Sequence, residues 1–547
     1  MCHSNLRNWI AVSRFLSVVG AAVALLLTAS AHAAAPGITG ASFSLNAGTG
    51  YSSQPDGMLI YSWGYGCAGG FTPTYAPAVF APPPGKTAGI GFCPLMQLPG
   101  PTLIVKEGTT FAVTLTNSLP AAAGNTSILF PGLTVTATSG CATPAGLLTC
   151  EAAPGATITY TVSAAVGTAG THQYYSGTQP DLQIEMGLFG AVIVLPATPP
   201  ANCTATETGR VDYRLASSAY DHASTCYDRE YLFQWSELDP RIHKQVEDQL
   251  KLIASCPTTA SFQFSCPTRL DVVTEPYHPN YFMINGRSMP DTMDPNYAPN
   301  YPNQPYNANP HMHPGELILV RYIGQGHWQH PFHEHGNHVR ILGRDGNLLV
   351  SQTNPALLAG RMEFDTDTTP GQAAEGIFYW SGKGLGWDIF GHTPGNAGNP
   401  PCNPDANGYY TTASGAALPT YSAAGVFASG SPNYYEWCAD HDVPLEANPV
   451  GTVGGGGPMT LPDPLILTNG LWYNGTPYLG PDAVNRSRGP TPLPPGSALQ
   501  NPPLESGIAF MWHSHNEREI TTNDVFPGGM LMMMLVDPYV WNIDETL

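Results

Sequence analysis

The sequence predicts an all-β protein with long connections between its strands. The chain has 59 glycines and 54 prolines among its 547 residues, and long helical periodicities are few, a pattern typical of many strands joined by long connections. Apolar residues alternate with Ala or Thr over 111–115 and over 158–162, as expected for half-buried antiparallel strands. One helix is expected to begin at Asp239-Pro240, with an apolar stripe of Ile242, Val246, Leu250 and Ile253.

Changes in composition predict the domain organisation. A first domain is expected over about 41–200, ending in an apolar strand at 190–195 and a Pro-rich stretch at 197–200. A second domain is expected from 203 to 547. Within it, residues 393–503 are rich in Gly, Pro and Asn and carry few strand signals. We expect this segment to be a long loop-rich insertion, because loops of such length are uncommon inside a compact domain.

The N-terminal residues 1–33 have the features of a signal peptide. Arg7 and Arg14 supply positive charge before an apolar run over 15–29, and Ala31-His32-Ala33 has the small-x-small form of a cleavage site. No later stretch approaches the roughly 20 apolar residues that a membrane-spanning helix needs. The sequence therefore predicts an exported protein, periplasmic or extracellular, without a membrane span.

Cysteine and charge usage agree with export. Ten cysteines follow the signal peptide, an even number that favours disulfides in an exported chain. The simplest pairing joins neighbours: Cys67–Cys93, Cys141–Cys150, Cys203–Cys226, Cys256–Cys266 and Cys402–Cys438. The net charge of −20, with only 11% of residues charged, argues against nucleic acid or an anionic membrane as a partner, since both require basic surfaces.

Two histidine clusters predict a metal site. The first is His330-Pro-Phe-His333-Glu-His335, and the second is His513-Ser-His515 near the C-terminus. Alternate residues of a strand share a face, so His333 can share a pocket with His335, and His513 with His515. Imidazole binds copper, zinc, iron and nickel readily. Each cluster lies beside an apolar segment rather than in a polar tail, which favours ligands over an incidental His-rich tract.

Several segments resemble the cupredoxin domains of multicopper oxidases. They are Pro99-Gly-Pro-Thr-Leu-Ile-Val-Lys-Glu-Gly108 with 111–117, Gly170-Thr-His-Gln-Tyr-Tyr175 with 187–194, Tyr281-Phe-Met-Ile-Asn-Gly-Arg287, the stretch 330–336, and Trp512-His-Ser-His515 with Gly529-Met530. The resemblance implies two tandem cupredoxin-like Greek-key sandwiches. It also implies that His330 is a ligand of the mononuclear blue copper, and that His333, His335, His513 and His515 are ligands of the copper cluster that reduces dioxygen.

The copper motifs of the resemblance are degenerate in this chain. The first two His motifs of the family fall on Leu129-Phe-Pro-Gly132 and Tyr175-Ser-Gly177, which have no histidine, and the Cys that binds blue copper is Ser514. The following blue-copper His falls at Glu519. A hydroxyl cannot replace a soft thiolate, so we expect no blue copper.

The remaining residues predict a rewired metal centre in the second domain. His330, His333, His335, His513 and His515 are the expected ligands, and Glu519 is the expected carboxylate ligand or proton donor. Copper is the first choice, with iron, zinc and manganese as alternatives that suit a mixed nitrogen and oxygen set. Expected partners are the metal ion, dioxygen and a small reduced substrate, and by analogy with two-domain relatives other copies of the chain. The alternative to an oxidoreductase is a non-catalytic protein that sequesters copper or serves a structural role at the surface.

Overall fold

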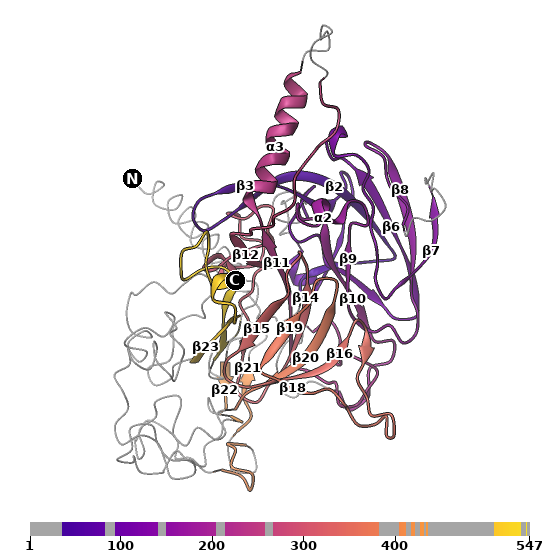
Figure 1. Ribbon diagram of the computed structural model, residues 1–547. Helices are drawn as coiled ribbons and strands as arrows, with labels where there is room; N and C mark the ends of the chain where they lie inside the picture. Colours follow the sequence, from indigo (N-terminus) through magenta and orange to yellow (C-terminus); the bar gives the residue numbers. More distant parts are fainter. Residues whose placement is uncertain are drawn as a thin grey trace, which may run out of the picture.

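Two β-sandwiches form the described part of the molecule (Figure 1). The computed structural model describes residues 35–81, 93–139, 149–203, 214–256, 266–381, 404–411, 417–421, 427–430, 434–435, 508–537 and 543. The prediction of an all-β fold with two sandwiches is confirmed. The expected signal peptide and most of the expected insertion lie outside the described residues.

The first sandwich consists of two five-stranded sheets. Its first sheet has the order β4 (Thr74–Ala76), β1 (Gly37–Thr39), β5 (Leu103–Lys106), β10 (Phe189–Leu195) and β9 (Gly170–Tyr175). Its second sheet has the order β3 (Leu59–Cys67), β2 (Ser42–Ser53), β6 (Thr109–Asn117), β8 (Thr157–Ala164) and β7 (Thr134–Ser139). Strands β6 and β8 pair antiparallel, and every second residue of each is buried, as the alternation predicted.

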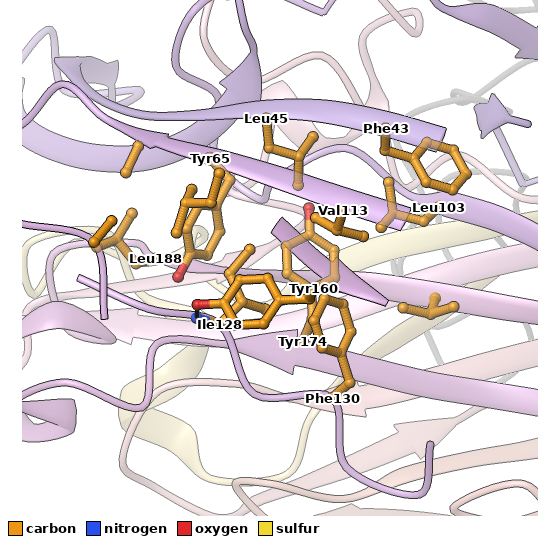
Figure 2. Packing of buried hydrophobic residues seen from close by; sticks show 14 of the residues in the cluster. Phe43, Leu45, Tyr65, Leu103, Val113, Ile128, Phe130, Tyr160, Tyr174 and Leu188 are labelled. Carbon is orange, nitrogen blue, oxygen red and sulfur yellow. Dashed lines mark hydrogen bonds between the residues drawn. The ribbon is translucent and has the colours of Figure 1, made fainter. Parts of the chain in front are cut away.

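Aromatic and aliphatic side chains from both sheets fill the first core (Figure 2). Phe130 contacts Phe111, Tyr160 and Tyr174 at ring-centroid distances of 6.4, 5.8 and 6.2 Å. Three phenol oxygens of this core donate to backbone carbonyls: Tyr65 to Ser127, Tyr160 to Cys150 and Tyr174 to Pro101, at 2.7, 2.7 and 2.8 Å. Burial of such large rings is the main source of stability in a sandwich of this size.

The second sandwich pairs a larger sheet with a five-stranded one. The larger sheet has the order β12 (Tyr281–Ile284), β11 (Arg229–Leu238), β14 (Leu317–Gly324), β20 (Ala373–Tyr379), β16 (Val339–Arg344) and β17 (Asn347–Leu348), with β18 (Met362–Glu363) also on β16. The other sheet has the order β13 (His311–Met312), β24 (Leu531–Val536), β23 (Ile508–Ser514), β15 (His330–Glu334) and β19 (Asp365–Thr368). A short ribbon, β21 (Thr420–Tyr421) with β22 (Phe427–Ser429), belongs to the expected insertion.

Few helices accompany the sheets. Helix α3 (Pro240–Ser255) begins where predicted, and Asp239 caps it by accepting a hydrogen bond from the Arg241 amide. Ile242 and Val246 of its apolar stripe are buried against the first core, while its far end projects beyond the sandwiches (Figure 1). The others are α2 (Pro180–Gln183) and the 3₁₀ turns η1 (Ala78–Phe80), η2 (Ala121–Ala123), η3 (Asp291–Met293) and η5 (Glu517–Ile520). No helix among the described residues is both long and apolar enough to cross a membrane.

The two sandwiches pack directly against each other. One buried cluster joins Ile104 and Ile193 of the first sandwich to Leu232 and Ile323 of the second. Three of the predicted disulfides are present, at Cys67–Cys93, Cys203–Cys226 and Cys256–Cys266. Cys150 is disulfide-bonded, but its predicted partner Cys141 and the pair Cys402–Cys438 lie outside the described residues.

Candidate metal centre

Strand pairing brings the two histidine clusters together. Strands β15 and β23 run antiparallel, with His333 directly opposite His513. The ring centroids of His333 and His335 are 4.5 Å apart, those of His335 and His513 are 5.2 Å apart, and those of His333 and His515 are 5.3 Å apart. We refer to these four side chains as the imidazole cluster.

Hydrogen bonds orient two rings of the imidazole cluster. His513 Nδ1 lies 2.7 Å from the Ser514 carbonyl oxygen, and His333 Nδ1 lies 2.7 Å from the Phe364 carbonyl oxygen. His333 Nδ1 is also 2.8 Å from Asp365 Oδ1. An Nδ1–H that donates to a carbonyl leaves Nε2 as the atom with a free lone pair, which is how ligating histidines are usually held.

The geometry of the cluster fits a metal only in part. His335 Nε2 and His513 Nε2 are 3.1 Å apart, close to the separation of two nitrogens that each lie about 2.0–2.1 Å from one metal ion. Within the described part of the chain, however, no group of three or more His, Cys, Asp or Glu side chains is arranged to hold a metal ion. A third imidazole ligand would therefore require one of the remaining rings to rotate.

The four rings of the imidazole cluster differ in solvent exposure. His513 is 8% exposed, whereas His515 is exposed and the other two are intermediate. Burial lowers the pKa of His513, and the charges of His333 and His515 lower it further, against a hydrogen bond to the Ser514 carbonyl that raises it. A ligating imidazole must be neutral, so this electrostatic environment favours the form that binds metal.

His330 occupies a different environment from the imidazole cluster. Its ring is fully buried between two buried carboxylates, with Nε2 3.0 Å from Glu237 Oε2 and Nδ1 2.9 Å from Glu519 Oε2. Burial alone would lower the pKa of His330, but the hydrogen bonds to Glu237 and Glu519 raise it to about 9. His330 is thus a buried imidazolium, with both ring nitrogens engaged by carboxylates.

The residues aligned with the blue-copper ligands form a hydrogen-bonded network. Ser514 Oγ donates to Glu519 Oε2 at 2.5 Å, and Asn516 Nδ2 donates to Glu519 Oε1 at 2.9 Å. His330, Ser514 and Glu519 are therefore near neighbours, as the resemblance implied, but their polar atoms bond to one another through Glu519. We refer to His330, Glu237, Glu519 and Ser514 as the imidazolium network.

Glu237 was missed by sequence reasoning. It is the next-to-last residue of the apolar strand β11, 93 residues before His330, and also accepts hydrogen bonds from the backbone amides of His327 and Trp328. A carboxylate among buried residues such as Trp235 and Leu238 was the signal available, because a buried charge requires a partner. Nothing in the sequence indicated that this partner is His330.

The degenerate motifs of the first sandwich are structural. The Leu129 amide donates to the Tyr175 carbonyl at 2.8 Å, so the two segments where the family has histidines pair with each other. Phe130 lies in the core shown in Figure 2. Ser176 Oγ donates to Gln183 Oε1 at 2.6 Å. These segments contribute packing and hydrogen bonds in place of imidazoles.

Comparison with known proteins finds a family match within the first sandwich. Residues 95–199 match the family model described as multicopper oxidase. This part of the chain is therefore similar to a multicopper oxidase domain. The match spans both motif positions that lack histidine, so the copper motifs of this domain are degenerate.

Solved copper proteins are similar in structure at low sequence identity. The blue copper oxidase from Nitrosomonas europaea is 14% identical, with 90% of this chain and 85% of that chain covered and a TM-score of 0.41. The multicopper oxidase mgLAC is 12% identical, with 91% and 85% covered and a TM-score of 0.41. The copper nitrite reductase from Nitrosomonas europaea is 16% identical, with 62% and 85% covered and a TM-score of 0.36. No curated protein matches the sequence.

Proposed function

We propose that this protein is an exported oxidoreductase of the multicopper oxidase type that binds copper in its second domain and lacks a blue copper. The ligands are His333, His335, His513 and His515. The observation that carries the proposal is the 3.1 Å separation of His335 Nε2 and His513 Nε2. The proposed domains are 41–200 and 203–547, with an insertion at 393–503 and a signal peptide at 1–33.

Copper is the proposed metal because the cluster is made of imidazoles and residues 95–199 are similar to a multicopper oxidase domain. Bound copper would supply one-electron redox chemistry toward dioxygen or a small reduced substrate. The protein's own residues have separate roles. The carbonyls of Ser514 and Phe364 orient His513 and His333, and the exposed His515 leaves one side of the cluster open to solvent and substrate.

We assign a supporting role to His330 and Glu519. Both were expected in or beside the metal site, but the carboxylate of Glu519 is engaged by His330, Ser514 and Asn516. In our proposal the imidazolium network braces strand β23 from the side of Ser514, between the two ligands His513 and His515. Glu519 then acts through the position of that strand rather than as a metal ligand.

The imidazolium network also supports a second candidate function. A Ser hydroxyl and a carboxylate stand where an electron-accepting copper would need a thiolate and an imidazole. A chain without that route would bind copper without turnover, as a sequestering protein or a structural surface protein. Oxygen consumption in the presence of copper and a small aromatic or metal-ion reductant distinguishes the oxidoreductase from this carrier.

The test of metal binding is elemental analysis of the disulfide-bonded protein after loading with copper and removal of excess ions. We expect one or two copper ions per chain, lost in the double variant His333→Ala/His513→Ala. His222→Ala is the matched control, because His222 is a half-buried imidazole outside the imidazole cluster that contacts the Pro355 carbonyl, and it should retain the copper. Paramagnetic resonance and visible spectra of the same samples should show copper without an intense blue thiolate band. Equal copper content in the wild type and the double variant would refute the ligand assignment.

A further inference from the structure

A buried polar contact joins the two sandwiches away from the imidazole cluster. Glu375 of β20 is fully buried, and its Oε2 accepts a hydrogen bond from the Thr171 amide of β9 at 3.2 Å. The approach depends on Gly170, whose φ is +129°. A Cβ built there would lie 2.8 Å from Glu375 Oε1 and 2.8 Å from the Tyr220 hydroxyl. Glu375 Oε1 and the Tyr220 hydroxyl thus both lie close to the backbone of the first sandwich at Gly170, which has no side chain.

The positive charge nearest in register to Glu375 is already paired. Arg321 of β14 lies opposite Glu375 in the sheet, but its Nε and Nη2 donate to Glu230 Oε2 at 3.1 and 3.0 Å. Arg321 Nη1 donates to Thr171 Oγ1 at 3.1 Å. The Arg321 guanidinium is therefore paired with Glu230, and no ion pair joins it to Glu375 among the described contacts.

The other titratable groups around the junction are engaged elsewhere. His172 Nε2 lies 2.8 Å from the Thr168 carbonyl, and Asp345 Oδ1 accepts the Ala373 amide at 2.8 Å. Arg344 of β16 lies near Glu363 at 3.4 Å, and Tyr227 donates to Glu230 at 2.9 Å.

The two buried side-chain oxygen atoms nearest to the Gly170 position have no hydrogen-bond partner among the described residues. They are Glu375 Oε1 and the Tyr220 hydroxyl. An ionised carboxylate with one oxygen unpartnered is costly to bury, since an unsatisfied buried charge loses its hydration without compensation. A proton on the Glu375 carboxyl group removes that buried negative charge.

We propose that Glu375 is a buried carboxylic acid that holds a proton at the junction of the two sandwiches, and that the junction weakens when this proton is lost. Burial raises the pKa of Glu375 to about 7, although hydrogen bonds from Thr171 act to lower it. The junction is thus a pH-sensitive contact, intact in mildly acidic solution and destabilised once Glu375 ionises in its buried position.

The direction of the effect follows from proton linkage. The folded pKa of about 7 lies above the ordinary value of 4.5, so the folded state binds more protons than the unfolded chain between these values. The contribution of Glu375 to stability is complete below pH 4.5 and is lost as pH rises to about 7. Within that window the folding equilibrium constant should fall by up to about tenfold per pH unit on account of this one group.

The test compares the wild type with Glu375→Gln, which keeps the shape of a neutral carboxyl. The urea midpoint and the hydrogen-exchange rate of the Thr171 amide are measured from pH 5 to pH 8.5. We expect the exchange rate of the wild type to rise with pH beyond the intrinsic trend, and the variant to lack this additional rise and to be more stable than the wild type at pH 8. Glu363→Gln is the control, because Glu363 pairs with surface arginines, and it should follow the wild type.

A spectroscopic readout separates a held proton from a merely structural role. The wild type at pH 6 should show a protonated carboxylic-acid carbonyl band in the infrared that is absent from Glu375→Gln and disappears from the wild type by pH 8.5. Absence of that band at pH 6 would overturn the proposal, and would instead indicate an ionised carboxylate bridged by water. A pH profile of Glu375→Gln parallel to that of the wild type would overturn it as well.

Discussion

Removing the buried positive charge at His330 should destabilise the second sandwich strongly. In His330→Gln an uncharged side chain of similar size would face Glu237 and Glu519, both fully buried. Breaking a buried ion pair by deleting one partner costs about 3–5 kcal/mol, because the remaining charge has lost its hydration without compensation. Here one cation lies between two carboxylates, so we expect a loss of free energy of unfolding toward the upper end of that range at pH 6.5.

The pH dependence provides a second estimate of the same interaction. The pKa of His330 is raised from 6.5 to about 9 by its carboxylate partners, against burial, which corresponds to roughly 3 kcal/mol. Because the folded pKa exceeds the unfolded one, this stabilisation is complete below pH 6.5 and is lost as pH rises to about 9. The wild type should therefore lose roughly 3 kcal/mol across that window, and His330→Gln should lose much less.

Urea unfolding followed by the fluorescence of buried tryptophans at pH 6.5 and pH 9 measures both effects. His222→Gln is the control, since it replaces a half-buried imidazole that faces no carboxylate in the described contacts, and it should leave both midpoints near those of the wild type. The reasoning would be refuted if His330→Gln unfolded at the same urea concentration as the wild type at pH 6.5. It would also fail if the difference between the two proteins were the same at both pH values.

Three further substitutions test the surrounding structure. Ser514→Ala removes the hydroxyl that donates to Glu519 and should lower the free energy of unfolding by about 1–3 kcal/mol. The copper content, measured by elemental analysis, should not change. Loss of copper would contradict the assignment of Ser514 to the imidazolium network rather than to the metal site. Asp239→Ala removes the cap of helix α3 and should cost about 1 kcal/mol, measured by urea unfolding, with an unchanged midpoint arguing against the cap. Gly170→Ala places a Cβ 2.8 Å from Glu375 Oε1 at a φ of +129°, and the resulting strain should lower the free energy of unfolding by about 1–3 kcal/mol. A thermal midpoint equal to that of the wild type would contradict the close approach of Glu375 to the Gly170 backbone.

Local patterns predicted the elements correctly where one face of a segment is buried. The alternation at 111–115 and 158–162 became strands β6 and β8 because those apolar side chains fill one core. The apolar stripe after Asp239 became helix α3 for the same reason. Neighbouring cysteines formed three of the predicted pairs, since each pair lies within one local connection.

The five histidines predicted as metal ligands lie in two different environments. Period-2 spacing predicted that His333 would share a face with His335, and the antiparallel register of β15 and β23 brought both to His513. His330 has the same residue type and lies only three positions from His333, yet it is enclosed by carboxylates from β11 and η5. Spacing along one strand gives no information about which distant strand covers each face.

The sequence by itself determined that the chain is built of β-strands and where its histidines cluster, because these depend on residue type and on periodicity along a strand. The sandwiches and the missing thiolate followed from the resemblance to multicopper oxidases. Only the tertiary structure decided that Glu237 meets His330, that Arg321 pairs with Glu230 rather than Glu375, and that Gly170 admits Glu375 to the junction. Those outcomes depend on the register between strands far apart in the chain. At such positions the dielectric is low and an unpaired charge is costly, so the partner that each buried charge finds in space determines its protonation and its role.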